Sequence, residues 1–188
     1  MNDGSGPGAT APAATESFDE VIVPHLDAAY RLARWLMRNE DDADDVVQEA
    51  SLRALRYFRT FTGGNGRAWF LSVVRNTCRS WRRQGEQEAS ESFDEERHFD
   101  RSARNPETLA LQGDDLMLIK RAMENVPDRF RELLVLRELE GLSYREIAEV
   151  MNIPMGTVMS SLSRARQAFR GALDNELQQS RIERTTRN

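Results

Sequence analysis

The segment 85–105 divides the chain into two parts. It holds seven acidic residues and no leucine, isoleucine, valine or methionine. A stretch of this composition cannot bury enough apolar surface to join a hydrophobic core, and it is typical of a linker. Each remaining part has the size of a small domain, which buries only ~60% of the surface its unfolded chain exposes. The sequence therefore predicts two marginally stable domains that work within a larger assembly.

Apolar residues recur at spacings of three and four in both parts, and this pattern predicts helices. In the first part we expect helices over about 18–37, 43–58 and 67–83. In the second part we expect them over about 106–125, 130–139, 144–151 and from 155 to beyond 173. No segment alternates as a strand does, so the predicted fold class is all-α, with two small helical domains joined by a flexible acidic linker.

The apolar faces of the first three helices define the expected core of the N-terminal domain. The first contributes Val21, Ile22, Leu26, Ala29, Tyr30, Ala33, Leu36 and Met37. The second contributes Val46, Val47, Ala50, Ala54, Leu55 and Phe58, and the third Trp69, Phe70, Val73, Val74, Thr77 and Trp81. The predicted boundaries are a disordered tail over 1–17, a first domain over 18–84, the linker over 85–105, a second domain over 106–178 and a tail over 179–188.

The strongest local signal lies in the second domain. Ser143 and Glu146 have the spacing of a capping box, which predicts the start of a short helix. A turn ending at Pro154 separates this helix from a longer one that begins near Met155. This arrangement is typical of a helix-turn-helix that places its second helix in the major groove of DNA, and an ordinary helical hairpin with a solvated polar face is the alternative. The side of that helix opposite its apolar stripe displays Gly156, Ser160, Ser163, Arg164 and Gln167.

Composition excludes several other classes of protein. No apolar run reaches the ~20 residues of a membrane span, and the N-terminus has neither a basic start nor an apolar stretch. We therefore expect a cytoplasmic protein without membrane insertion. Cys78 is the only cysteine, and His25 and His98 lie far apart in the sequence, so we expect neither a metal site nor another cofactor. The glycine-rich loop 63–66 lacks the Lys-Ser/Thr of a phosphate-binding loop, and no catalytic constellation is apparent, so we expect no enzyme.

Charge is strongly segregated along the chain. The formal net charge is −5, yet residues 51–83 contain eight arginines and no acid. Residues 155–173 add three arginines, again with no acid. Two basic zones in an acidic chain indicate local nucleic-acid contacts rather than general coating of DNA, although a solvated basic face is the simpler alternative.

Motifs in both domains resemble those of the extracytoplasmic-function (ECF) sigma factors, which belong to the sigma-70 family of bacterial RNA polymerase specificity subunits. In the first domain the similar segments are 44–50 (DDVVQEA) and 67–76 (RAWFLSVVRN). In the second they are 133–142 (LLVLRELEGL), 143–148 (SYREIA), 156–158 (GTV) and 163–166 (SRAR). The resemblance covers nearly all of 18–173 except the linker. It implies a factor that directs core RNA polymerase to promoters and helps to open the DNA strands.

The resemblance also implies roles for individual residues. The residues expected to dock on the clamp helices of the largest polymerase subunit are Asp44, Asp45, Gln48 and Glu49. Those expected to bind the minus-ten promoter element are Arg75, Asn76, Arg79, Ser80, Arg82 and Arg83, with Asn76 in a pocket for an extruded base. Those expected to bind the minus-thirty-five element are Thr157, Ser160, Ser163, Arg164, Arg166 and Gln167. Trp69, Phe70 and Trp81 have the spacing of a buried stripe, which favours core packing over base stacking.

The second domain departs from the family pattern at two positions. Met159 and Ser161 stand where many family members carry basic residues, which implies fewer phosphate contacts or a different base preference. The family also implies restraint of the free chain by an anti-sigma protein. The resemblance further implies that the acidic linker occupies the RNA channel of the polymerase, and a disordered spacer is the alternative.

Two alternatives stay open from the sequence alone. The first is a helix-turn-helix regulator that acts without polymerase, which gives no role to residues 44–49. The second is a hydrolase that uses Asp44 and Asp45, for which the residues supply no partner nucleophile or base.

Overall fold

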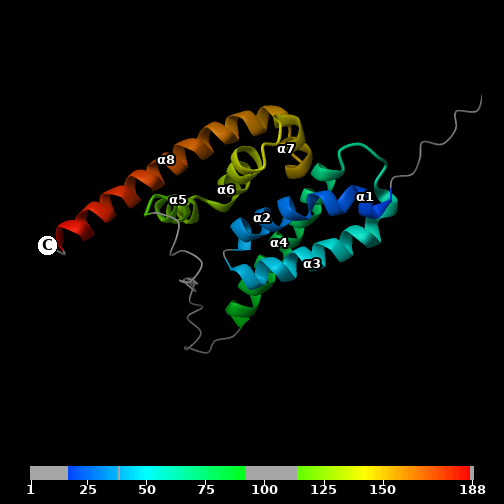
Figure 1. Ribbon diagram of the computed structural model, residues 1–188, viewed down its shortest axis with the longest axis horizontal. Helices are drawn as coiled ribbons and strands as arrows, with labels where there is room; N and C mark the ends of the chain where they lie inside the picture. The colour runs from blue at the N-terminus through cyan, green and yellow to red at the C-terminus, as the bar shows by residue number, and fades with distance from the viewer. Residues whose placement is uncertain (1–16, 38, 92–113, 187–188) are drawn as a thin grey trace, which may run out of the picture.

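This computed structural model describes residues 17–37, 39–91 and 114–186, and within these ranges the regular structure is helical throughout (Figure 1). The N-terminal domain consists of α1 (Phe18–Ile22), α2 (Leu26–Met37), α3 (Glu40–Tyr57) and α4 (Gly66–Glu91), with short 3₁₀ turns at Val23–His25 and Phe58–Thr60. The C-terminal domain consists of α5 (Asp114–Asn125), α6 (Asp128–Leu134), a π-helical turn (Val135–Leu139), α7 (Tyr144–Met151) and α8 (Met155–Thr186). The all-α fold class is thereby confirmed.

The first predicted helix is in fact two helices. A capping box formed by Ser17 and Glu20 starts α1, and Pro24 interrupts the chain with a 3₁₀ turn before α2 begins. The interruption turns Leu26 outward, where it is 36% exposed, so its assignment to the core was wrong. Leu32, which the expected stripe omitted, is fully buried instead.

Helices α3 and α4 complete the N-terminal domain. Val46, Ala50 and Ala54 are buried as expected, but Leu55 is 55% exposed, and its assignment to the core was also wrong. Helix α4 continues to Glu91, into the segment where the sequence predicts a linker. The loop before α4 carries Gly63 and Gly64 at φ +86° and +101°, a backbone region that other residues rarely adopt.

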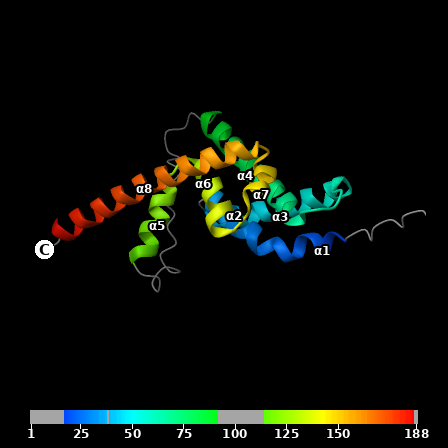
Figure 2. The same ribbon diagram turned by 90° about the horizontal axis from the view of Figure 1, so that it is seen from above.

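The C-terminal domain contains the predicted helix-turn-helix. Ser143 and Glu146 form both hydrogen bonds of the capping box, and α7 has the predicted bounds. Asn152 ends α7 in the left-handed conformation, at φ 51°, and α8 starts three residues later. Helix α8 continues through 179–186, where the sequence predicts a tail, and its C-terminal end extends away from the other helices (Figures 1 and 2).

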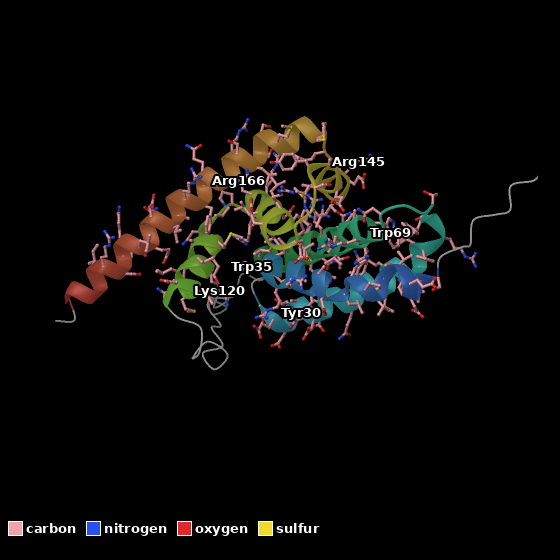
Figure 3. All side chains as sticks on the ribbon, turned by 45° about the horizontal axis from the view of Figure 1, so that its top comes forward. Tyr30, Trp35, Trp69, Lys120, Arg145 and Arg166 are labelled. Atoms are coloured by element: carbon pink, nitrogen blue, oxygen red, sulfur yellow. The ribbon has the colours of Figure 1, made fainter. Side chains whose placement is uncertain are left out.

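The two domains pack against each other rather than lying apart. Helix α7 contacts α4, and α6 contacts α2, so the buried apolar residues of both domains form one cluster. Side chains from both domains fill the space between them (Figure 3). The expected helix start at Asn105-Pro106 and all but Ser17 of the predicted tail over 1–17 lie outside the described residues.

Candidate nucleic-acid interface

One exposed face of α3 carries the acidic residues singled out in the sequence. Asp44, Asp45 and Gln48 are exposed, while Glu49 is half-buried and accepts a hydrogen bond from Nε of Arg53 at 2.8 Å. Asp45 and Gln48 are thus directly available to a partner, whereas Asp44 also interacts with the side chain of Tyr30.

Two leucines extend this face toward the C-terminal end of α3. Leu52 and Leu55 are 53% and 55% exposed, and they follow Gln48 at helical spacings of four and seven residues. An exposed leucine pair beside carboxylates is typical of a protein docking surface. The apolar pattern did not predict an exposed role for either leucine, although Leu52 lies outside the apolar stripe of its predicted helix, which was a signal.

The exposed face of α4 carries part of the predicted minus-ten set. Asn76, Arg79 and Arg83 are exposed and Ser80 is half-buried, with its hydroxyl donating to the Asn76 carbonyl oxygen at 3.1 Å. Spacings of three and four residues place Asn76, Arg79 and Arg83 on one side of the helix, in line with Ser72. This side of α4 offers two guanidinium groups and an amide to solvent.

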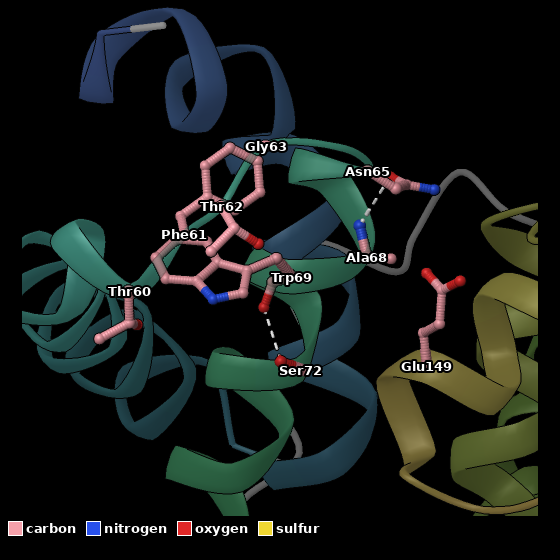
Figure 4. A pocket seen from close by; sticks show the side chains of 9 residues that line it. All are labelled: Thr60, Phe61, Thr62, Gly63, Asn65, Ala68, Trp69, Ser72 and Glu149. Carbon is pink, nitrogen blue, oxygen red and sulfur yellow. Dashed lines mark hydrogen bonds between the residues drawn. The ribbon is translucent and has the colours of Figure 1, made fainter. Parts of the chain in front are cut away.

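A pocket of about 250 Å³ opens beside the start of this face (Figure 4). Its wall comprises Thr60, Phe61, Thr62, Gly63, Asn65, Ala68, Trp69, Ser72 and Glu149. Trp69 packs against Phe61, with ring centroids 5.3 Å apart, and lines the pocket at the same time. Trp69 therefore belongs both to the core, as expected, and to a surface where a planar group could stack, whereas Phe70 is fully buried.

Arg75 and Arg82, also predicted for the minus-ten set, lie apart from this exposed side. Arg75 is only 6% exposed, and its Nε donates to Oε2 of Glu132 in α6 at 2.7 Å. Arg82 forms an ion pair with Asp128, the first residue of α6. Both guanidinium groups are therefore engaged by the C-terminal domain.

Helix α8 presents most of the predicted minus-thirty-five set to solvent. Val158, Leu162 and Ala165 are buried and attach the helix to its domain, as expected. The polar residues on the opposite side are exposed, namely Ser160, Ser163, Arg164 and Gln167. Thr157 is half-buried near the start of the helix.

Arg166 is held within its own domain. Its Nε and Nη2 donate to Oε1 of Glu138 at 3.0 and 2.8 Å, and this carboxylate raises the pKa of the arginine above its ordinary value. The ion pair orients a cation at the edge of the exposed face.

The two departures from the family pattern differ in their surroundings. Met159 is 53% exposed on the face that would meet DNA, whereas Ser161 is buried. Only Met159 therefore changes the exposed surface of α8 directly.

The described residues were compared with two structural features, a cluster of metal-binding side chains and a helix that could span a membrane. Across 17–37, 39–91 and 114–186, no group of three or more His, Cys, Asp and Glu side chains is arranged to hold an ion. None of the helices in those ranges is long and apolar enough to cross a membrane.

Comparison with known families matches both domains. The model for sigma-70 region 2 matches residues 21–88, and the model for sigma-70 region 4 matches residues 116–169. The chain is 36% identical over 146 residues to the ECF RNA polymerase sigma-E factor of Escherichia coli, covering 73% of this chain and 74% of that protein. It is 34% identical over 167 residues to the ECF RNA polymerase sigma factor SigE of Mycolicibacterium smegmatis, covering 86% of this chain but only 63% of that protein.

Solved structures agree with these matches. The sigma factor RpoE of Bartonella quintana, determined with the anti-sigma factor NepR, gives a TM-score of 0.69 at 29% identity and covers 84% of this chain and 96% of that chain. CnrH, determined with the cytosolic domain of CnrY, gives 0.62 at 24% identity, with 84% and 88% covered, and supports the fold alone. The two matched regions, their order and the similarity along most of the chain lead to one conclusion: this protein belongs to the ECF sigma factors of the sigma-70 family.

Proposed function

We propose that this chain binds core RNA polymerase, recognises a two-part promoter and helps to separate the DNA strands, while the polymerase performs the chemistry. One observation carries the proposal. The two family matches, over 21–88 and 116–169, fall on the domains that hold the exposed faces of α3, α4 and α8. A stand-alone regulator would have no use for the face of α3.

The face of α3 is the proposed polymerase contact. Asp44, Asp45 and Gln48 supply charge and hydrogen bonding at its polar end, and Leu52 and Leu55 supply apolar area at the other. Carboxylates facing a basic partner steer association and fix its register, and the leucines add the desolvated centre that stable interfaces need.

The minus-ten element is the proposed ligand of α4. Extraction of a base from the stack costs a few kcal/mol, which stacking and hydrogen bonds in a pocket must offset. Trp69 and Phe61 offer aromatic faces in the pocket, Asn76 offers an amide further along α4, and Arg79, Ser80 and Arg83 can hold phosphates. Arg75 and Arg82 join this set only after they leave Glu132 and Asp128.

The minus-thirty-five element is the proposed ligand of α8. Ser160, Ser163, Arg164 and Gln167 face outward and would enter the major groove, with Arg164 as the main base contact. Thr157 and Arg166 lie at the border of this face, where phosphate contacts are more accessible. The free chain would be restrained by an anti-sigma protein, as RpoE of Bartonella quintana is bound by NepR.

Reconstituted transcription tests the whole proposal. Core polymerase with the purified chain should initiate at defined start sites on a promoter library, whereas core alone should not. The chain should also co-elute with core polymerase in size-exclusion chromatography. If the chain neither selects start sites nor co-elutes with core polymerase, a stand-alone regulator becomes the better explanation of its function.

Two variants separate the proposed faces. Asp45→Arg should weaken co-elution with core polymerase, while Asp174→Arg, the same charge reversal at an exposed position of α8, should not.

Asn76→Ala should reduce discrimination among minus-ten sequences and leave polymerase binding intact, with Gln84→Ala on the same helix as its control. If Asn76→Ala and the wild type select the same minus-ten sequences equally well, the proposed role of Asn76 in minus-ten recognition is wrong.

A further inference from the structure

The helix that we propose for the major groove carries a large apolar side chain on its exposed surface. Met159 is the fifth residue of α8, and its side chain lies largely in solvent, with 53% of the residue exposed. The core does not require this side chain, because Val158, Leu162 and Ala165 are buried and anchor the same stretch of helix. The side chain of Met159 is therefore available to a ligand.

Met159 lies in the part of α8 that approaches the bases most closely when such a helix binds DNA. Recognition helices contact base edges with residues near their N-terminal end, and α8 begins directly after the turn that follows α7 (Figure 1). Gly156 precedes Met159 by three residues and Ser163 follows it by four, so the three exposed residues lie along one side of the helix. A Cβ on Gly156 would have open space around it, so the surface beside Met159 is low and accessible.

The first nine residues of α8 contain no charged side chain. Residues 155–163 read MGTVMSSLS, and Arg164 is the first charged residue of the helix. The commonest specific contact in the major groove is a bidentate pair between arginine or lysine and guanine. The N-terminal part of α8 has no such group to offer, and it presents hydroxyl groups and the thioether of Met159 instead. Its base preference must therefore rest on different chemistry.

Thymine is the base that an apolar side chain recognises in the major groove. Its C5-methyl group is an apolar contact point, whereas the other groups that distinguish the base pairs there are hydrogen-bond donors and acceptors. Methionine suits this contact because it has three rotatable bonds and a polarisable sulfur, so it adapts to an irregular surface. A contact between the two groups removes apolar area of both from water, which favours thymine at the contacted position.

We propose that Met159 makes this chain prefer thymine at one position of its minus-thirty-five element, through contact between the thioether and the C5-methyl group of that base. The inference rests on the proposed function of α8. It deepens that function, because it assigns a base and an atom to a position where the chain departs from its family. Arg164 keeps its role as the main hydrogen-bonding contact, five residues further along the helix.

Replacement of thymine by uracil tests the contact, because it removes the methyl group and keeps the hydrogen bonds of the base pair. Core polymerase with the wild-type chain first selects promoters from a library of minus-thirty-five sequences. Each thymine of a selected element is then replaced in turn by uracil, and the dissociation constant of the polymerase–promoter complex is measured. One replacement should weaken binding about fourfold, which corresponds to ~0.8 kcal/mol for one methyl group.

Substitution of Met159 shows whether its side chain reads the methyl group. With Met159→Ala, the thymine and uracil forms of the sensitive promoter should bind equally well. Met159→Leu keeps an apolar side chain of similar size and should retain most of the fourfold difference. Leu177→Ala is the matched control, since Leu177 is 38% exposed and lies about five turns further along the same side of α8. This control should leave the fourfold difference unchanged.

Two results would overturn the proposal. The first is an element in which no replacement of thymine by uracil weakens binding, and the second is an equal methyl effect in Met159→Ala and the wild type. Start-site selection on the unmodified promoter reports the proposed function separately. If the wild-type chain selects start sites without any methyl effect, the proposed function stands and the role of Met159 is wrong. If it selects none, both fail together.

Discussion

At the scale of single residues, buried Arg131 holds the start of the C-terminal domain together. Its Nε donates to the Met123 carbonyl oxygen at 2.8 Å, and its Nη2 donates to those of Glu124 and Val126 at 2.9 and 2.8 Å. These carbonyls lie at the C-terminal end of α5 and in the turn to α6, where helical partners are missing. Arg131 therefore supplies hydrogen-bond donors to carbonyl oxygens at the end of α5, where donors from the helix itself run out.

We predict that Arg131→Met lowers the free energy of unfolding by about 3 kcal/mol, because three carbonyl oxygens each lose a hydrogen bond from a buried guanidinium. Urea denaturation followed by circular dichroism measures the change. Arg129→Met, on an exposed site of α6, is the control and should have a small effect. Equal losses for the two variants would show that the carbonyl contacts of Arg131 contribute little.

The cap of α7 makes stability depend on pH. Hydrogen bonds from Ser143 lower the pKa of Glu146 below its usual value, with a smaller contribution from Asn65. A carboxylate whose pKa is lowered by folding stabilises the native state above its unfolded pKa, and this contribution is lost as pH falls through the folded pKa.

We therefore predict that part of the loss of stability on acidification belongs to Glu146. Between neutral pH and pH ~3, below the usual carboxylate range, the free energy of unfolding should fall less in Glu146→Gln than in the wild type. Glu149→Gln reports the effect of removing a carboxyl from α7 outside the cap. Identical pH profiles for Glu146→Gln and the wild type would contradict the assignment.

At the scale of elements, the approach of α4 to α1 depends on a glycine. A Cβ on Gly66, the first residue of α4, would lie 2.6 Å from Cγ1 of Val21 and 3.4 Å from the Val21 carbonyl oxygen. Val21 is 5% exposed, so its side chain has little room to move. The pair fixes how closely these two helices pack.

We predict that Gly66→Ala destabilises the chain by about 1 kcal/mol, because the overlap outweighs the better helix propensity of alanine. Val21→Ala should cost stability alone but should largely relieve the effect of Gly66→Ala when the two are combined. A double-mutant cycle by urea denaturation measures this coupling. If the effects of Gly66→Ala and Val21→Ala are additive, the contact between these two residues is not the source of the strain.

Helices with complete local signals were predictable from the sequence. The capping box at Ser143 gave the start of α7, and the turn ending at Pro154 gave the start of α8, because capping and proline geometry act over a few residues. The break at Pro24 and the outward turn of Leu55 were missed. In both cases packing in the whole domain, rather than apolar spacing, decided which side of the helix was buried.

At the scale of the whole molecule, the packing of the two domains could not be read from the sequence. Arg31 and Glu140 are 109 residues apart, and Arg75 and Glu132 are 57 apart, so no local pattern links the partners. The sequence did indicate which surfaces carry charge. It did not indicate that acidic residues around α6 and α7 would cover arginines of α2 and α4.

Burial of the Arg75–Glu132 pair and of the Glu140 carboxylate between the two domains has a consequence for the response to salt. Salt screens exposed charges strongly, with a Debye length of about 3 Å at 1 M, but screens buried pairs much less. We predict that the radius of gyration of the free wild-type chain stays nearly constant from low salt to 1 M sodium chloride. Small-angle X-ray scattering measures it, with the same chain at low salt as the reference. Expansion of the wild type at high salt would mean that the partly exposed Arg82–Asp128 pair dominates instead.

Cys78 lies fully buried in α4 on the far side from solvent, and burial raises the pKa of its thiol to about 12. Near neutral pH almost none of it is the reactive thiolate, so oxidants and alkylating reagents reach it only when the N-terminal domain unfolds locally. Because the sequence contains no other cysteine, the rate at which an alkylating reagent modifies the protein measures how often the N-terminal domain opens around Cys78.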